Sequence, residues 1–250
     1  MTNRQRKILQ KVIEHYQNTG EPISSRWLVE QGDLKVSPAT VRSELHELES
    51  LGMLEHLHTS GGRLPTEAGY RFYINSCLEV QGLADPLLAS FVKNACVQFG
   101  SDAFELSRAL GLFLSRRLAM PVISSIDDGL DCWKGGFSFL SRYEEMWGKE
   151  RILPILAFID QFEYLFAGII DHRMLERGSA PVQVFIGEDN QQFGLKDIAL
   201  IVCRFPLPAR SHGRLLIIGP MRMHYQNTLP YISNLVHEIE KLYSDKNISN

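Results

Sequence analysis

One stretch, residues 37–52, carries the signals for both ends of a helix and constrains the fold more than any other part of the chain. Ser37 is a favoured N-cap, and Pro38 suits the first helical turn because its missing N–H would have no partner there. Gly52 can adopt the left-handed conformation that ends a helix. Apolar residues recur at helical spacing along one face: Val41, Leu45, Leu48 and Leu51. The sequence therefore predicts a bounded helix with one face in a core.

The other face of this helix carries short hydrogen-bonding side chains and a cation near its N-terminal end. Its residues are Ala39, Thr40, Arg42, Ser43 and His46. A recognition helix offers such a surface to base edges and phosphates in the DNA major groove. An ordinary surface helix is the alternative that this stretch alone leaves open.

The segments before this helix complete a helix-turn-helix pattern. Residues 3–17 have apolar side chains at helical spacing, and the pattern stops near Gly20. A short second helix is expected after Pro22, capped by Ser24 or Ser25. Residues 32–36 then form the turn into the capped helix.

The segments after it predict a β-hairpin wing and a further helix. Residues 53–58 begin a half-buried strand, residues 59–62 can turn, and residues 63–64 return. Arg63, at the end of a glycine turn with little steric cover, can reach a phosphate or the adjacent minor groove. Thr66 then caps a helix whose aromatic residues pack on the wing.

Composition limits how the chain can bind nucleic acid. The 250 residues are 44% hydrophobic and 22% charged with a net charge of −3, which excludes a disordered or generally polybasic chain. DNA contact must then come from local charge, such as that of Arg4, Arg6, Lys7 and Lys11. The four cysteines are too far apart for a CxxC site, and no signal peptide or membrane-spanning run is visible. We expect a cytoplasmic protein with no membrane contact.

The rear of the chain alternates helical and strand-length patterns. Helices are expected at 83–99, 101–118, 152–166 and 225–243, and strands at 121–124, 182–187, 198–203 and 214–219. Residues 127–129 read as an acidic turn. The pattern suggests an antiparallel sheet with helices packed on it.

The chain shows no local signature of an enzyme. His46 and His237 each begin a zinc-protease-like His-Glu pair, but each lacks the second histidine four residues later. No Walker loop, nucleophile elbow or dinucleotide-binding glycine pattern is present. We therefore expect no enzymatic activity, no metal and no cofactor.

Five motifs in fixed order over residues 4–73 resemble the winged helix of the HrcA heat-inducible transcription repressor family. They are QRKIL at 5–9, TGEPI at 19–23, SPATVR at 37–42, LESLG at 48–52, and HTSGGRLPT at 58–66 with GYR at 69–71. The resemblance implies a dimeric bacterial repressor that binds an inverted-repeat operator ahead of chaperone operons. It also implies inactivation on heat shock, with the chaperonin GroEL helping to keep the repressor active.

The rear of the chain is similar to the same family at FIGEDN, 185–190, and GRLLIIGPMRMHY, 213–225, which lie in a GAF-like domain of the family. The chain departs from the family between residues 123 and 133. There the family has several strands and an inserted dimerisation domain, whereas this chain has only a short acidic loop. This departure weighs against the family's usual dimer contact and against a GAF-type ligand pocket.

The patterns predict an α+β protein in three parts: a winged helix-turn-helix DNA-binding domain at 1–75, a helical linker or dimerisation segment at 76–123, and a regulatory domain at 124–250. The resemblance implies that this last domain is GAF-like, without most of the usual inserted dimerisation domain. The expected partners are double-stranded DNA, a second copy in a homodimer, and GroEL by resemblance. A ligand-sensing regulator and a protein-interaction module without specific DNA binding are the alternatives.

The predicted DNA-binding residues fall into groups. Thr40, Arg42, Ser43 and His46 read the major groove, and Ser37 with the helix N-terminus holds a phosphate. Arg63 acts with Thr59 and Ser60 at the wing, and Arg4 and Arg6 clamp the backbone. The full set is Arg4, Arg6, Ser25, Arg26, Ser37, Pro38, Ala39, Thr40, Arg42, Ser43, His46, Thr59, Ser60, Gly61, Gly62 and Arg63.

Overall fold

The protein forms two compact units, each with a core of its own, in a computed structural model. Residues 1–31, 34, 36–56, 62–80, 85–126, 131–143, 149–162, 180–208 and 211–246 are described. The first unit comprises Met1–Glu79 with Arg222–Gln226, and the second comprises Val80–Met221 with Asn227–Asn250. Within the described ranges, no helix combines the length and apolar character needed to cross a membrane.

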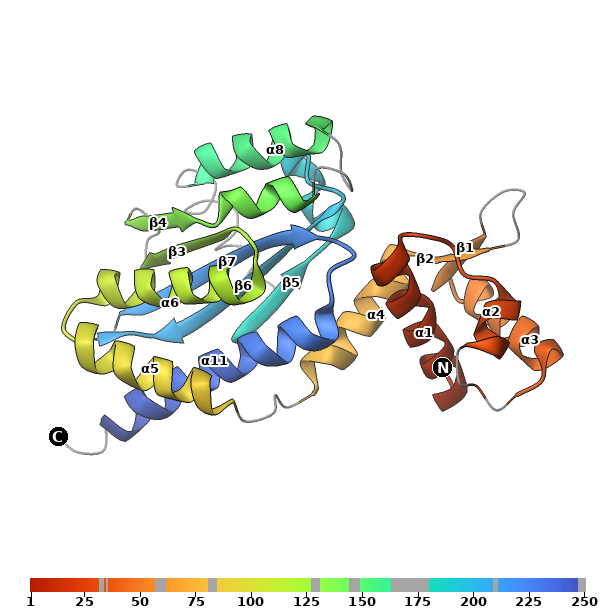
Figure 1. The fold of residues 1–250 in the computed structure, drawn as a ribbon, viewed down its shortest axis with the longest axis horizontal. Helices are drawn as coiled ribbons and strands as arrows, with labels where there is room; N and C mark the ends of the chain where they lie inside the picture. The colour runs from red at the N-terminus through yellow and green to blue at the C-terminus, as the bar shows by residue number, and fades with distance from the viewer. Residues whose placement is uncertain are drawn as a thin grey trace. The chain divides into compact units, whose positions relative to one another are not determined.

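The first unit has the predicted winged helix-turn-helix order of three helices, a hairpin and a fourth helix (Figure 1). The elements are α1 Asn3–Thr19, α2 Ser25–Glu30, α3 Pro38–Ser50, β1 Leu54–His56, β2 Arg63–Pro65 and α4 Glu67–Leu78. The strands β1 and β2 pair antiparallel, with Leu54 opposite Pro65. The prediction of a winged helix at the N-terminus is confirmed.

Side-chain caps fix where the helices of the first unit begin. The hydroxyl of Ser37 accepts a hydrogen bond from the Thr40 N–H at 3.1 Å, and that of Thr66 accepts one from the Gly69 N–H at 3.1 Å. Of the two serines that could cap α2, Ser24 does so, with its hydroxyl 3.1 Å from the Trp27 nitrogen. Each cap satisfies an N–H that the first helical turn leaves without a partner.

The core of the first unit is built from the apolar faces of α1, α3 and α4. Its buried residues include Ile8, Leu9, Val12, Ile13, Leu28, Val41, Leu45, Leu48, Leu54, Tyr70 and Ile74. Leu51, which was expected in the same stripe, is instead 49% exposed. The helix ends at Ser50, so Leu51 is the C-cap residue and the chain already turns away from the core there.

A third segment joins the wing and was not predicted. Ile23, in the connector between α1 and α2, exchanges two backbone hydrogen bonds with Arg63, of 3.0 and 2.9 Å. This pairing brings the chain so close that a Cβ on Gly62 would lie 2.5 Å from the Cβ of Pro22. Gly62 is therefore needed for a close approach to Pro22, a role that the sequence did not indicate.

A second close approach, at Gly69 of α4, predicts a large effect of adding one methyl group. A Cβ at Gly69 would lie 2.2 Å from the Met53 carbonyl oxygen, so the backbone would have to move. We expect Gly69→Ala to destabilise the first unit by about 1–3 kcal/mol, as overpacked sites do. Urea unfolding measures it, with Asn75→Ala as an exposed control on the same helix, expected within about 0.5 kcal/mol of wild type.

The second unit contains a five-stranded antiparallel sheet covered by helices on both faces (Figure 1). Its strands are β3 Val122–Ile126, β4 Cys132–Gly135, β5 Val182–Phe185, β6 Ile198–Pro206 and β7 His212–Pro220, in the order β4-β3-β7-β6-β5. Its helices are α5 Pro86–Phe99, α6 Ala103–Leu118, η1 Phe137–Tyr143, α8 Lys149–Asp160, η3 Gly187–Phe193 and α11 Tyr225–Lys246.

Strand β3 shows how the two faces are used. Ser124 meets α6, where its hydroxyl lies 2.6 Å from that of Ser107, whereas Ile123 belongs to a core cluster with Ile155 and Phe158 of α8. Neighbouring strand residues point to opposite faces, so one strand serves both helices. Burial on both faces also explains why the predicted strands of this region read as continuous apolar runs.

The predicted antiparallel sheet with helices is confirmed, and the three apolar runs form β5, β6 and β7. Strand β4 was not among the predicted strands. The acidic turn at 127–129 and residues 163–166 of the predicted helix lie outside the described residues. The division at 75 and 123 remains a prediction.

Candidate nucleic-acid interface

The N-terminal half of α3 presents the surface expected of a recognition helix. Exposed along it are Ser37, Pro38, Ala39, Arg42, Ser43 and His46, and Thr40 is half-buried. The opposite face, with Val41, Leu45 and Leu48, is buried in the first unit. A firm apolar anchor therefore holds the exposed face in a fixed orientation.

Arg42 stands out among the candidate cations. It is exposed on α3, and within the described part of the chain it has no ion-pair partner. Its guanidinium presents donors in a fork that matches two acceptors of a guanine edge or a phosphate. Arg42 is thus placed to contact a partner without first giving up an intramolecular ion pair.

The hydroxyls at the start of α3 are already engaged with each other. Besides capping the Thr40 N–H, the Ser37 hydroxyl lies 2.9 Å from the Thr40 hydroxyl. The positive end of the helix dipole is at the same place, which suits an anion such as a phosphate.

Two other candidate arginines are held by carboxylates of α3. Nη1 of Arg4, from α1, lies 3.2 Å from Oε1 of Glu44, and Nε of Arg63, from β2, lies 2.6 Å from Oε1 of Glu49. The Arg63 side chain is only 20% exposed, so it does not extend freely as the sequence suggested. The two ion pairs join α3 to α1 on one side and to the wing on the other.

Arg26 and Ser25 lie at the start of α2. Arg26 is exposed and its Nε lies 2.7 Å from Oε1 of Glu30, one turn along the same helix. Such an exposed pair is weak and can exchange for a phosphate. Thr59, Ser60 and Gly61, predicted at the wing tip, lie outside the described residues.

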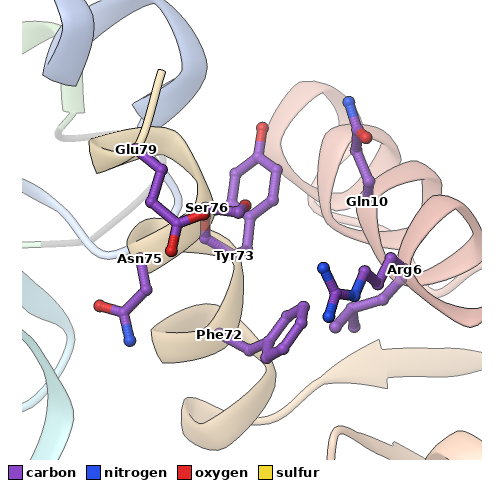
Figure 2. A pocket seen from close by; sticks show the side chains of 8 residues that line it. Arg6, Gln10, Phe72, Tyr73, Asn75, Ser76 and Glu79 are labelled. Carbon is purple, nitrogen blue, oxygen red and sulfur yellow. Dashed lines mark hydrogen bonds between the residues drawn. The ribbon is translucent and has the colours of Figure 1, made fainter. Parts of the chain in front are cut away.

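Arg6 is directed toward α4 rather than α3. Its guanidinium carbon lies 5.6 Å from the centroid of the Phe72 ring, within a groove between α1 and α4 of about 440 Å³ (Figure 2). Residues two apart on a helix lie about 200° apart around its axis, so Arg4 and Arg6 cannot serve the same face. The groove is lined by Arg6, Leu9, Gln10, Phe72, Tyr73, Asn75, Ser76 and Glu79.

Three parts of this interface were not found in the sequence. Glu44 and Glu49, which hold arginines, and Ile23, which pairs with Arg63, were not singled out in the sequence. An acidic residue near the C-terminal end of a helix opposes the helix dipole. Glu49 at that position was therefore a signal that a cation should be sought nearby.

The described residues offer little for catalysis. No group of three His, Cys, Asp or Glu side chains among them could hold a metal ion. Burial raises the pKa of Cys77 to about 11 and that of Cys203 to about 12, so both thiols stay protonated at neutral pH. Neither is a thiolate nucleophile.

Comparisons with known proteins agree with this geometry. Residues 1–77 match the family described as winged helix-turn-helix transcription repressor, HrcA DNA-binding, and residues 101–229 match the HrcA protein C terminal domain. The chain belongs to the HrcA family. That family consists of transcription repressors rather than enzymes, and the resemblance predicted from the five motifs is confirmed.

Relatives in the HrcA family align along nearly the whole chain. The heat-inducible transcription repressor HrcA of Moorella thermoacetica is 49% identical, over 97% of this chain and 99% of the relative. That of Clostridium tetani is 28% identical, over 99% and 97%. The alignment with the Moorella protein spans 346 positions, well beyond the 250 residues of this chain, so it contains long gaps on this side.

The fold also has a counterpart among solved structures. A crystal structure described as that of a hypothetical protein superposes with a TM-score of 0.70, at 16% identity, over 98% of each chain. At this identity the likeness concerns the fold alone.

Proposed function

We propose that this protein represses transcription by binding duplex DNA, with the N-terminal half of α3 in the major groove and the wing beside it. The observation that carries the proposal is Arg42, an exposed cation with no ion-pair partner among the described residues, on the outer face of a capped and well-anchored helix. The relatives of this protein in Moorella thermoacetica and Clostridium tetani are named heat-inducible transcription repressors.

In this complex the exposed side chains of α3 have separate tasks. Arg42, Ser43 and His46 face base edges with Thr40, while the helix N-terminus at Ser37 receives a phosphate. Pro38 and Ala39 allow the backbone to approach the groove closely. Arg4, Ser25, Arg26 and Arg63, with the wing-tip residues Thr59, Ser60 and Gly61, supply contacts that position the domain on the DNA backbone. Arg6 and the buried Gly62 are left out of the direct contacts.

The operator is an inverted repeat ahead of chaperone operons, and the protein reads it as a homodimer. Two copies related by a two-fold axis present their α3 helices to half-sites about one helical turn apart, roughly 34–36 Å. Following the family resemblance, GroEL is the partner that keeps the repressor in its DNA-binding state, and the protein acts in the cytoplasm.

Fluorescence-anisotropy titration tests this proposal. The purified full chain is titrated into a duplex inverted repeat from a chaperone promoter and into a scrambled duplex, at about 50 and 200 mM salt. We expect tight binding to the repeat, far weaker binding to the scrambled duplex, and the mass of a dimer on the repeat. Addition of GroEL should raise the fraction of protein that binds.

Equal weak binding to both duplexes would contradict sequence-specific repression and favour a protein-interaction module. Tight binding to the repeat by a single copy would retain the DNA-binding function and reject the dimer.

A further inference from the structure

Glu49 occupies a position where a carboxylate is locally unfavourable. It is the next-to-last residue of α3, close to the carbonyl groups that form the negative end of the helix dipole. Its side chain is only 18% exposed, so water screens this cost little. A residue that weakens its own helix in this way needs a partner elsewhere in the fold.

The partners of Glu49 lie on the two elements that face DNA in the proposed complex. Oε1 lies 2.6 Å from Nε of Arg63 at the start of β2, and Oε2 lies 3.4 Å from Nδ1 of His46 on the exposed face of α3. His46 is 79% exposed, whereas Arg63 is mostly covered. One carboxylate therefore connects the recognition helix to the base of the wing.

The backbone of Arg63 is fixed at the same place. Its N–H donates to the Ile23 carbonyl at 2.9 Å, and its carbonyl accepts from the Ile23 N–H at 3.0 Å. The side chain, in contrast, is long and has several rotatable bonds, so it can leave the carboxylate without any movement of the strand. Arg63 can thus exchange the Glu49 carboxylate for a DNA phosphate once DNA is near.

We propose that Glu49 is a positioning residue that determines specificity by restraining Arg63. This inference rests on the proposed function. On non-cognate DNA the carboxylate keeps Arg63 and repels phosphate, so Arg63 contributes no contact. On the operator, α3 docks fully and brings a phosphate close enough to displace the carboxylate, and Arg63 adds its contact only there.

Removing the Glu49 carboxylate should therefore strengthen binding to non-cognate DNA. In Glu49→Gln, the Arg63 guanidinium loses its carboxylate partner, so it can exchange to a phosphate of any duplex and gains one phosphate contact on scrambled DNA. Each phosphate contact adds about 0.9 to the slope of log K against log salt. Between about 50 and 200 mM salt, the affinity of the variant for scrambled DNA should fall roughly 3.5-fold more than that of wild type. The ratio of operator to scrambled affinity should decrease.

Glu47→Gln is the matched control. Glu47 lies on the same helix, is exposed, and has no ion-pair partner among the described residues. Its substitution removes the same charge but releases no arginine, so the salt slope on scrambled DNA should stay that of wild type. The double variant Glu49→Gln/Arg63→Gln should also return to the wild-type slope, because the released contact is gone.

If Glu49→Gln does not fold, Glu49→Asp takes its place in the test. This variant keeps the charge and shortens the side chain by one methylene. It should steepen the slope on scrambled DNA as well, because the shorter carboxylate no longer reaches Nε of Arg63. Equal slopes for the Glu49 and Glu47 variants, or a steeper slope that persists in the double variant, would overturn the inference. Failure of wild type to prefer the operator would instead reject the proposed function.

Discussion

Arg42→Ala is expected to weaken operator binding by about 1–3 kcal/mol, which is roughly 5- to 150-fold in Kd. The exposed guanidinium on α3 has no ion-pair partner among the described residues, so the loss is that of its contact with a base edge or phosphate. Because Arg42 lies on the outer face of α3, thermal unfolding of the protein should be unchanged. Anisotropy titration against the operator duplex measures the effect.

Arg108→Ala provides the control for that measurement. Arg108 is an arginine of α6 in the second unit, paired with Glu105 at 2.6 Å, and lies outside the winged helix. The same loss of charge there should leave operator affinity within a factor of about two. If Arg42→Ala behaved like Arg108→Ala, Arg42 would have no place in the interface.

Leu45→Ala should destabilise the first unit by about 2–5 kcal/mol, because it removes a fully buried side chain and leaves a cavity. Leu45 is 1% exposed and lies on the inner face of the helix that carries Arg42. Urea unfolding followed by the fluorescence of Trp27, in α2, reports on this unit when Trp133 and Trp147 are replaced by Phe in both wild type and variant. Operator binding should fail at temperatures where the variant unfolds and wild type does not.

Leu51→Ala is the same substitution on a side chain that is 49% exposed. It should change stability by no more than about 0.5 kcal/mol. A similar loss for both variants would mean that the end of α3 is buried in solution, contrary to the structure.

Arg42→Ala and Leu45→Ala distinguish the roles of the two opposite faces of α3. Arg42→Ala changes affinity at constant stability, and Leu45→Ala changes stability, with affinity following only through the folded fraction. The ion pairs of Arg4 with Glu44 and of Arg63 with Glu49 lie between these faces. These ion pairs hold Arg4 and Arg63, and so affect which cations are available to DNA.

Local sequence determined most of the winged helix. Ser37, Pro38 and Gly52 specify both ends of α3 through interactions within a few residues, and the apolar spacing of Val41 and Leu45 specifies its inner face. The five motifs were sufficient to identify the HrcA family. Such signals are readable because caps, turns and periodicity depend only on near neighbours in the chain.

The tertiary structure decides which of the predicted DNA-binding residues are available to DNA. Sequence alone could not pair Arg4 with Glu44, 40 residues away, place Arg6 over Phe72, or bring Ile23 to Arg63. Strand β4 was also not predicted, although its pairing with β3 is local, with Ser125 opposite Cys132. All four of its residues are half-buried, so neither an apolar run nor a clear alternation marks it in the sequence. An arginine carries the same positive charge wherever it stands in a sequence. Whether it is offered to DNA or held by a carboxylate depends on distances of a few ångströms that only the folded chain sets.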